Sequence, residues 1–170
     1  MIRTVSSGIA LLVAAASAGA QEPRPRRPDL TVNLIVDGGM GGINVPVRFW
    51  SLRIGFEGEI DAAGNLNPAL PQPSKPLTPA AHTRLEALLD KERFFDRQYR
   101  TIWCAPDIGA RVIRARRGTT QRSVSFCLDG PDVAVSEARS LLRVWYGVLS
   151  TVADGKTVPV SDLDKRLLAK

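Results

Sequence analysis

Apolar residues recur at every second position in two early parts of the chain, as they do in β-strands with one buried face. The first part is residues 30–36, which we predict to be a strand. A second alternation runs over residues 45–49 and resumes in the opposite phase over residues 52–56. The change of phase predicts one kinked strand, or two short strands, with a bulge or bend near Trp50.

A β-hairpin is predicted further along the chain. Residues 109–116 and 121–128 flank the turn-forming sequence Arg117-Gly118-Thr119-Thr120. Val124 and Phe126 lie two apart and mark the face that we expect to be buried.

Three segments have apolar residues at helical spacing. The first runs from 79 to about 91, where Thr78 supplies a capping hydroxyl directly before a proline. The second, residues 131–153, has the most regular apolar face and is expected to stop at Gly155. A short helix is also expected over 161–168.

The order of these elements predicts a single α+β domain, with an antiparallel sheet of about four strands and two helices packed on one face. We expect the domain to span 30–153 and the segment 154–170 to be an appendage. Residues 61–77 are expected to form a proline-rich surface loop, because repeated prolines interrupt both helices and central strands. Phe94 and Phe95 are expected to pack the end of the first helix against the sheet.

The N-terminal 20 residues have the features of a secretory signal peptide. Arg3 precedes an apolar stretch over 9–16, and the small residues Ala18-Gly19-Ala20 suit cleavage before Gln21. The apolar stretch is shorter than the roughly 20 residues that a membrane span needs, so no span is predicted. We therefore expect a secreted or periplasmic protein that begins with a basic, proline-rich tail over 21–29.

Export changes what the two cysteines are expected to do. An oxidising compartment favours a disulfide between Cys104 and Cys127 over two free thiols. The alternative, a redox-active pair, lacks the Cys-x-x-Cys spacing that lowers a thiol pKa.

The composition argues against an enzyme. The chain has 170 residues, a net charge of +6 and one histidine. With both cysteines in a disulfide, only His82 remains as a strong metal ligand, so we predict no metal site and no cofactor. His82 falls in the first turn of the predicted helix over 79–91 and is expected to face solvent. A Gly-x-Ser-x-Gly nucleophile motif is absent from the sequence.

Arginines cluster in the predicted hairpin and suggest attraction for anionic polymers. A solvated charged surface is the alternative, because the chain uses Arg in preference to Lys throughout. The hairpin arginines are Arg111, Arg114, Arg116, Arg117 and Arg122.

A glycine-rich segment follows the first predicted strand and offers two large apolar side chains. Glycines there permit close backbone approach to a partner, or simply an unusual turn. It lacks the Gly-Lys-Ser/Thr ending of a phosphate-binding loop. The candidate partner-binding residues are Gly38, Gly39, Met40, Gly41, Gly42 and Ile43.

The succession of these segments resembles the emfourin family, small protein inhibitors of the thermolysin-like metalloprotease protealysin. The resemblance lies in the strand over 30–36 entering the glycine-rich segment, the Leu-rich helix ending near Phe94-Phe95, the two-stranded unit over 109–128 and the closing helix over 131–153. It implies an antiparallel sheet with helices, tight binding at a protease cleft, no cofactor and no reaction catalysed by the inhibitor.

Two functions follow as expectations. The first is a secreted or periplasmic protein-binding module, an inhibitor of thermolysin-like metalloproteases that acts through the glycine-rich segment. The alternative is an envelope-associated protein that binds anionic polymers or lipid head groups through its arginines, without catalysis. The sequence does not specify the oligomeric state.

Overall fold

The structure is a computed structural model that describes residues 29–37, 49–64, 75–99, 104, 109–127, 135–154 and 156–169. The predicted signal peptide and the basic tail up to residue 28 lie outside the described residues. Within them the elements are β1 (Leu30–Asp37), β2 (Trp50–Ile54), β3 (Ile60–Gly64), α1 (Pro79–Lys91), β4 (Ala110–Arg117), β5 (Thr120–Phe126), α2 (Val135–Val152) and α3 (Asp162–Ala169).

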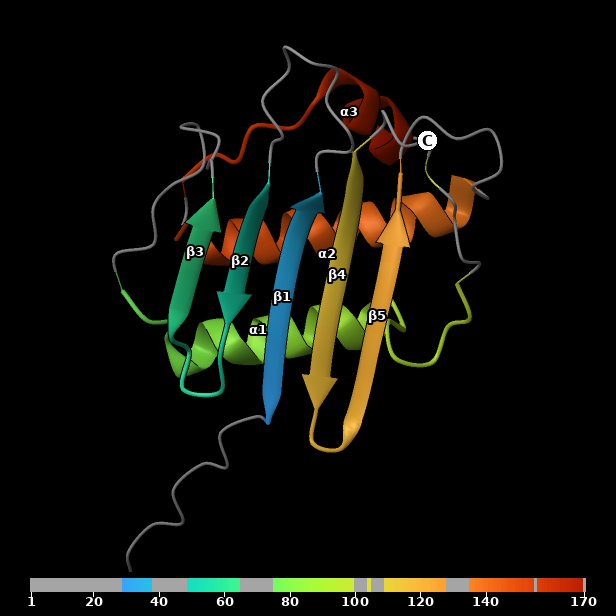
Figure 1. The fold of residues 1–170 in the computed structure, drawn as a ribbon. Helices are drawn as coiled ribbons and strands as arrows, with labels where there is room; N and C mark the ends of the chain where they lie inside the picture. Colours follow the sequence, from blue (N-terminus) through green and yellow to red (C-terminus); the bar gives the residue numbers. More distant parts are fainter. Residues whose placement is uncertain are drawn as a thin grey trace, which may run out of the picture.

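The strands form one antiparallel sheet in the order β3-β2-β1-β4-β5 (Figure 1). The first strand of the chain is therefore the central strand of the sheet. β1 pairs along its whole length with β4, although β2, β3 and α1 come between them in the sequence. The predicted α+β class and antiparallel sheet are confirmed.

Helices α1 and α2 lie side by side on one face of the sheet, as predicted (Figure 1). Alternate residues of β1 point toward these helices, and Leu30, Val32 and Leu34 are fully or almost fully buried. Leu85 of α1 and Leu142 of α2 are buried against them in the same core. The apolar periodicity of the sequence thus places the core between the sheet and the two helices.

The start of α1 is the one that the sequence predicts. The hydroxyl of Thr78 accepts a hydrogen bond from the backbone N–H of Ala81 at 3.2 Å, and Pro79 occupies the first helical position. This arrangement satisfies one of the N–H groups that a helix leaves unpaired at its beginning.

The expectation that His82 faces solvent is wrong, because its side chain is only 4% exposed. His82 lies three residues before Leu85 and seven before Leu89, so helical spacing puts all three on the buried face of α1. Its Nε2 atom is 3.3 Å from the carbonyl oxygen of Gly55. His82 therefore connects α1 to the turn between β2 and β3.

The sheet has five strands where about four were expected, because residues 61–64 of the predicted loop over 61–77 belong to β3. The strand is at the edge of the sheet, and its residues 61–64 are all exposed. An exposed edge strand has no buried face and so no apolar alternation for the sequence to reveal. Pairing with β2 holds it in the sheet, and the turn before it has a hydrogen bond from Gly55 N–H to the carbonyl of Glu59 at 2.9 Å.

The hairpin of β4 and β5 matches its prediction, with Gly118 in the turn at a φ of +55°. Val124 and Phe126 are buried, as expected. Cys127 follows β5 directly and forms the predicted disulfide with Cys104, with 5.6 Å between their Cα atoms.

The C-terminal segment forms the expected short helix, α3, which packs on α2. Ser161 caps it by accepting a hydrogen bond from the N–H of Asp164 at 3.1 Å. The Asp164 side chain is fully buried, and both Arg111 of β4 and Tyr146 of α2 donate hydrogen bonds to its carboxylate. α3 is therefore tied to the sheet as well as to α2. Gly155, the expected stop of α2, lies outside the described residues.

Candidate functional site

The face of the sheet opposite α1 and α2, here called the open face because no described helix covers it, carries side chains in rows that cross the strands. Partners in register point to the same side of a sheet, so Asn33 of β1 has Arg53 of β2 on one side and Arg114 of β4 on the other. Neighbouring strands lie about 4.8 Å apart, which separates the Cα atoms of the two arginines by about 10 Å. Both arginines are exposed.

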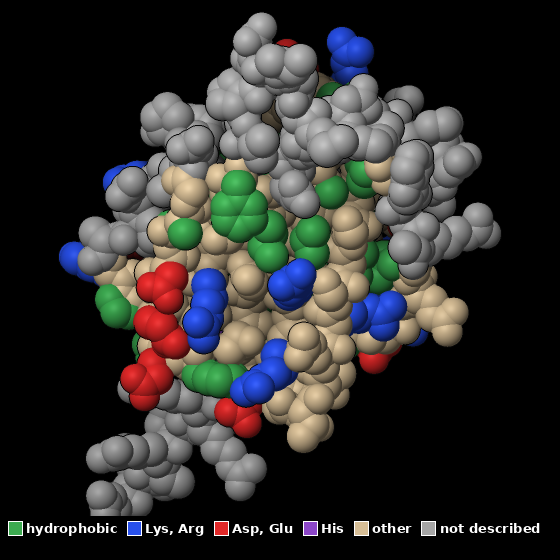
Figure 2. All heavy atoms as spheres, in the orientation of Figure 1, with side chains coloured by type: hydrophobic (Ala, Val, Ile, Leu, Met, Phe, Trp, Pro, Cys, Tyr) green, Lys and Arg blue, Asp and Glu red, His purple; other side chains and the backbone are tan. Residues whose placement is uncertain are grey.

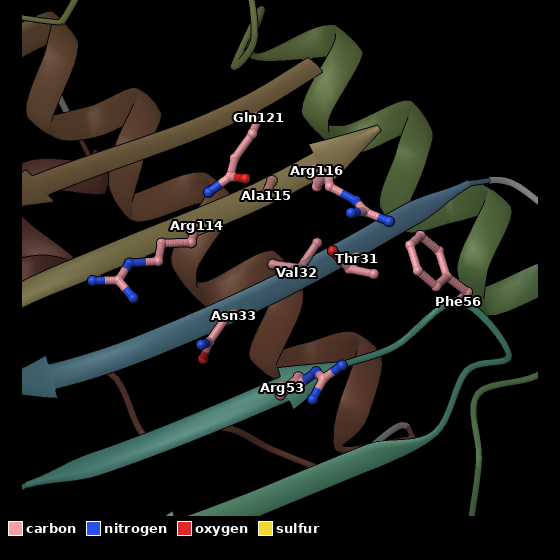
Figure 3. Close-up of a pocket in the computed structure, with 9 residues that line it drawn as sticks. All are labelled: Thr31, Val32, Asn33, Arg53, Phe56, Arg114, Ala115, Arg116 and Gln121. Atoms are coloured by element: carbon pink, nitrogen blue, oxygen red, sulfur yellow. The ribbon is translucent and has the colours of Figure 1, made fainter. Parts of the chain in front are cut away.

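A second row brings a third arginine to the same region. Arg116 of β4 is the register partner of Thr31 on β1 and of Gln121 on β5. Its guanidinium carbon lies 4.8 Å from the centre of the Phe56 ring, close enough for a cation–π contact (Figure 3). Phe56 lies two residues after the end of β2, in the turn, so an aromatic ring borders the row of arginines.

These two rows surround a shallow pocket of about 260 Å³ on the open face of the sheet (Figure 3). It draws residues from β1, β2, β4, β5 and the turn after β2, and the backbone pairing of the sheet holds them in place. The described residues that line it include no carboxylate, imidazole or thiol. The lining residues are Thr31, Val32, Asn33, Arg53, Phe56, Arg114, Ala115, Arg116 and Gln121.

The charge on this face is unevenly distributed. Figure 2 shows Lys and Arg side chains in the middle of the face and Asp and Glu side chains gathered at its β3 edge. Asp61 of β3 is the register partner of Arg53. Within the part of the chain that the structure describes, none of Arg53, Arg114 and Arg116 forms an ion pair with a carboxylate. Three permanently charged groups thus surround one pocket without anionic partners there.

Asn33 adds an unused acceptor to the pocket. Its side-chain oxygen is buried and accepts no hydrogen bond in the structure. A buried polar atom without a partner costs roughly 1–3 kcal/mol. A ligand that brings a donor to this atom would recover part of that cost, provided that the Asn33 side chain turns to expose the oxygen to the pocket.

The other hairpin arginines have partners within the fold. Arg111 Nη1 is 2.9 Å from Asp164, and Arg117 Nη1 is 2.8 Å from Asp90. Arg122 donates hydrogen bonds to two backbone carbonyls in the segment after α1. The hairpin arginines therefore do not form a single basic patch, because strand alternation sends three toward the helices and two toward the open face.

The ion pair of Arg111 and Asp164 is part of a buried cluster with Tyr146. Burial raises the pKa of Tyr146 to about 12, and the hydrogen bond to Asp164 acts in the same direction. The guanidinium of Arg111 also lies 5.6 Å from the centre of the Trp145 ring. This cluster holds α3 in place and does not contribute to the open pocket.

Sequence reasoning missed Arg53 and Phe56 as members of the site. Arg53 lies about 60 residues before the hairpin arginines, and only the pairing of β1 with both β2 and β4 brings them together. The signal that could have found it is the alternation of β2, which sets Arg53 opposite in direction to Leu52 and Ile54.

The candidate partner-binding residues of the glycine-rich segment lie outside the described residues; they are Gly38, Gly39, Met40, Gly41, Gly42 and Ile43. Where side chains are described, no three His, Cys, Asp or Glu residues gather in a group that could hold a metal ion. No helix in the described ranges has the length and apolar character to cross a membrane.

Comparison of the sequence with known protein families and with curated proteins finds no match. The resemblance to the emfourin family accordingly stays a prediction.

Proposed function

We propose that the protein is a non-catalytic binding module that holds an anionic ligand on the open face of its sheet. The observation that supports this proposal is the set of three arginines, Arg53, Arg114 and Arg116, around one pocket without ion-pair partners among the described residues. Each guanidinium offers five N–H donors in a planar fork, which matches carboxylate, sulfate and phosphate groups.

The arrangement favours binding over a purely structural role. Where this fold uses an arginine structurally, it supplies a carboxylate or carbonyl acceptor, as it does for Arg111, Arg117 and Arg122. Arg114 and Arg116 lie on the same strand, about 7 Å apart, and their like charges oppose one another. A bound anion would relieve that repulsion.

The proposal includes a location outside the cytoplasm. The disulfide between Cys104 and Cys127 supports an oxidising compartment, and the sequence of residues 1–20 suits export. The carboxylates and sulfates of cell-surface polymers are among the anions available there to such a protein.

The test is binding of the chain from residue 21 onward to heparin, a sulfated polysaccharide used as a general polyanion. Replacing both Arg53→Ser and Arg114→Ser should weaken binding at least tenfold, because hydrogen bonds to charged groups contribute about 1.5–3 kcal/mol each. Binding should also fall as salt rises, since salt screens exposed charges.

A matched control has the same change in charge on other surfaces. Arg84 of α1 and Arg166 of α3 are exposed and form no ion pair with another described residue. The double variant Arg84→Ser with Arg166→Ser should bind nearly as well as the unaltered chain. Equal losses in the two double variants would show that net charge alone drives binding, and would refute a site on the open face.

A further inference from the structure

We infer that the open-face pocket takes a uronic acid residue of an acidic polysaccharide, an inference that rests on the proposed anion-binding function. The pocket combines cationic groups with polar groups of a different kind. Asn33 and Gln121 have carboxamides and Thr31 has a hydroxyl, and each of these groups both donates and accepts hydrogen bonds. The complementary ligand is one that has an anionic group close to other groups that donate and accept hydrogen bonds.

The unused oxygen of Asn33 narrows the choice further. Asn33 lies between Arg53 and Arg114 in the row, and its oxygen is buried, so a ligand reaches that oxygen only if the side chain turns toward the pocket. The oxygen can only accept, so its partner must be a donor. Fully ionised phosphate and sulfate carry acceptors alone. A sugar ring with a carboxylate brings hydroxyl donors within a few bonds of the anion, and so matches both the arginines and Asn33.

The size and lining of the pocket suit one sugar unit. At about 260 Å³ it is smaller than the roughly 300–1,000 Å³ of sites for drug-sized ligands. Phe56 is half-buried at its border, with the Arg116 guanidinium over its ring, and adds apolar surface to the edge of the pocket. The remaining sugar units of a polymer would extend across the open face. Of Arg53 and Arg114, the arginine that does not bind the first carboxylate would then lie beside them.

An acidic peptide fits less well than a sugar. Peptides gain main-chain hydrogen bonds by adding to the edge of a sheet, whereas on the face of a sheet the strand N–H and C=O groups are already paired with each other. The edge strand β3 also carries the exposed Asp61, and the exposed Glu59 precedes this strand directly, so this edge would repel an acidic strand. A single-stranded nucleic acid would require bases to stack on successive aromatic residues, and Phe56 is the one aromatic residue among those that line the pocket.

The experiment compares three probes by calorimetry at one ionic strength. They are a galacturonic acid hexamer, the same hexamer with its carboxylates methyl-esterified, and a glutamate hexamer acetylated at its N-terminus and amidated at its C-terminus, so that it also has six carboxylates. We expect the galacturonate hexamer to bind about tenfold more tightly than either control. Asn33→Ala should weaken galacturonate binding about tenfold and leave glutamate binding unchanged, while Arg53→Ser with Arg114→Ser should weaken both.

Gln121→Ala provides the same comparison at an exposed position of β5, in case Asn33→Ala alters the fold. The sugar inference would be overturned if the galacturonate and glutamate hexamers bind with equal affinity and if Asn33→Ala and Gln121→Ala change both affinities alike. Anion binding itself would then still stand. Tighter binding of a thymidine hexanucleotide than of galacturonate would also overturn it. If the double variant Arg53→Ser with Arg114→Ser binds every anionic probe with unchanged affinity, the proposed function is refuted as well.

Discussion

The two faces of the β4–β5 hairpin use the same residue type for different purposes. On the face toward the helices, Arg111 and Arg117 pair with carboxylates, and each guanidinium lies over an aromatic ring. On the open face, Arg114 and Arg116 have no carboxylate partner among the described residues. A count of arginines in a hairpin therefore says little about ligand binding until the direction of each side chain is known.

The difference also lies in how well water reaches each group. Asp164 is fully buried and depends on Arg111 for charge compensation, so this pair belongs to the packing of the domain. Arg114 is exposed and keeps its hydration. The inner arginines should thus control stability and the outer ones binding.

The largest expected effect is that of Arg111→Met. Loss of the guanidinium leaves the buried carboxylate of Asp164 without a counter-charge, and breaking such a pair costs about 3–5 kcal/mol. Arg114→Met, three residues further along the same strand, should cost less than about 0.5 kcal/mol. Urea unfolding of both variants measures the difference. Adding Asp164→Asn to Arg111→Met should recover part of the loss, and equal destabilisation by the two Met variants would contradict the division between the faces.

A smaller effect should appear at alkaline pH. The pKa of Tyr146 is raised from 10.0 to about 12, so the folded state keeps a proton that the unfolded state loses above pH 10. This contribution to stability is complete below pH 10 and disappears as the pH rises through 12. Melting temperatures should therefore fall over that range, and less so for Tyr146→Phe.

Burial also raises the pKa of Tyr99, which supplies the control for that measurement. Tyr99→Phe should keep the alkaline loss that Tyr146 contributes. If Tyr146→Phe and the unaltered chain lose stability in parallel as the pH rises, then burial beside Asp164 does not raise the pKa of Tyr146.

The smallest expected effect on the inner face is that of Arg117→Ala. The Arg117 side chain is 32% exposed and that of Asp90 is 59% exposed, so solvent screens their ion pair. We expect a loss of about 1 kcal/mol or less, which should shrink further at high salt. A double-mutant cycle with Asp90→Ala measures the coupling free energy of this pair. A coupling as large as that of Arg111 with Asp164 would show that solvent exposure does not determine the strength of these ion pairs.

Local sequence patterns predicted the helices and strands that have a buried face. They failed where only pairing with a neighbouring strand determines the structure. β1 and α1 follow from apolar spacing and from the Thr78-Pro79 start, and the disulfide follows from having two cysteines. β3 has no buried face to reveal it. In β4 both Val112 and Ile113 are apolar, so the sequence leaves two phases open, and pairing with β1 selects the one that buries Ile113.

The site was less predictable than the fold for the same reason. The arginines could be found in the sequence, but the pocket exists only because β1 separates and aligns β2 and β4. The polar side chains on the helix-facing side of the sheet were not predicted, because His82 and the hairpin arginines were all assumed to face water. Three of those arginines instead have partners in the fold.

The central place of β1 has a consequence for how the chain is made. β1 leaves the ribosome first among the described strands, yet one of its two edges has no partner until β4 follows. At about 5–20 residues per second, the roughly 70 residues between them take several seconds to synthesise. Throughout that time the N–H and C=O groups of this edge can pair with a strand of another nascent chain. A chaperone that covers this edge of β1 until β4 is available would prevent such pairing.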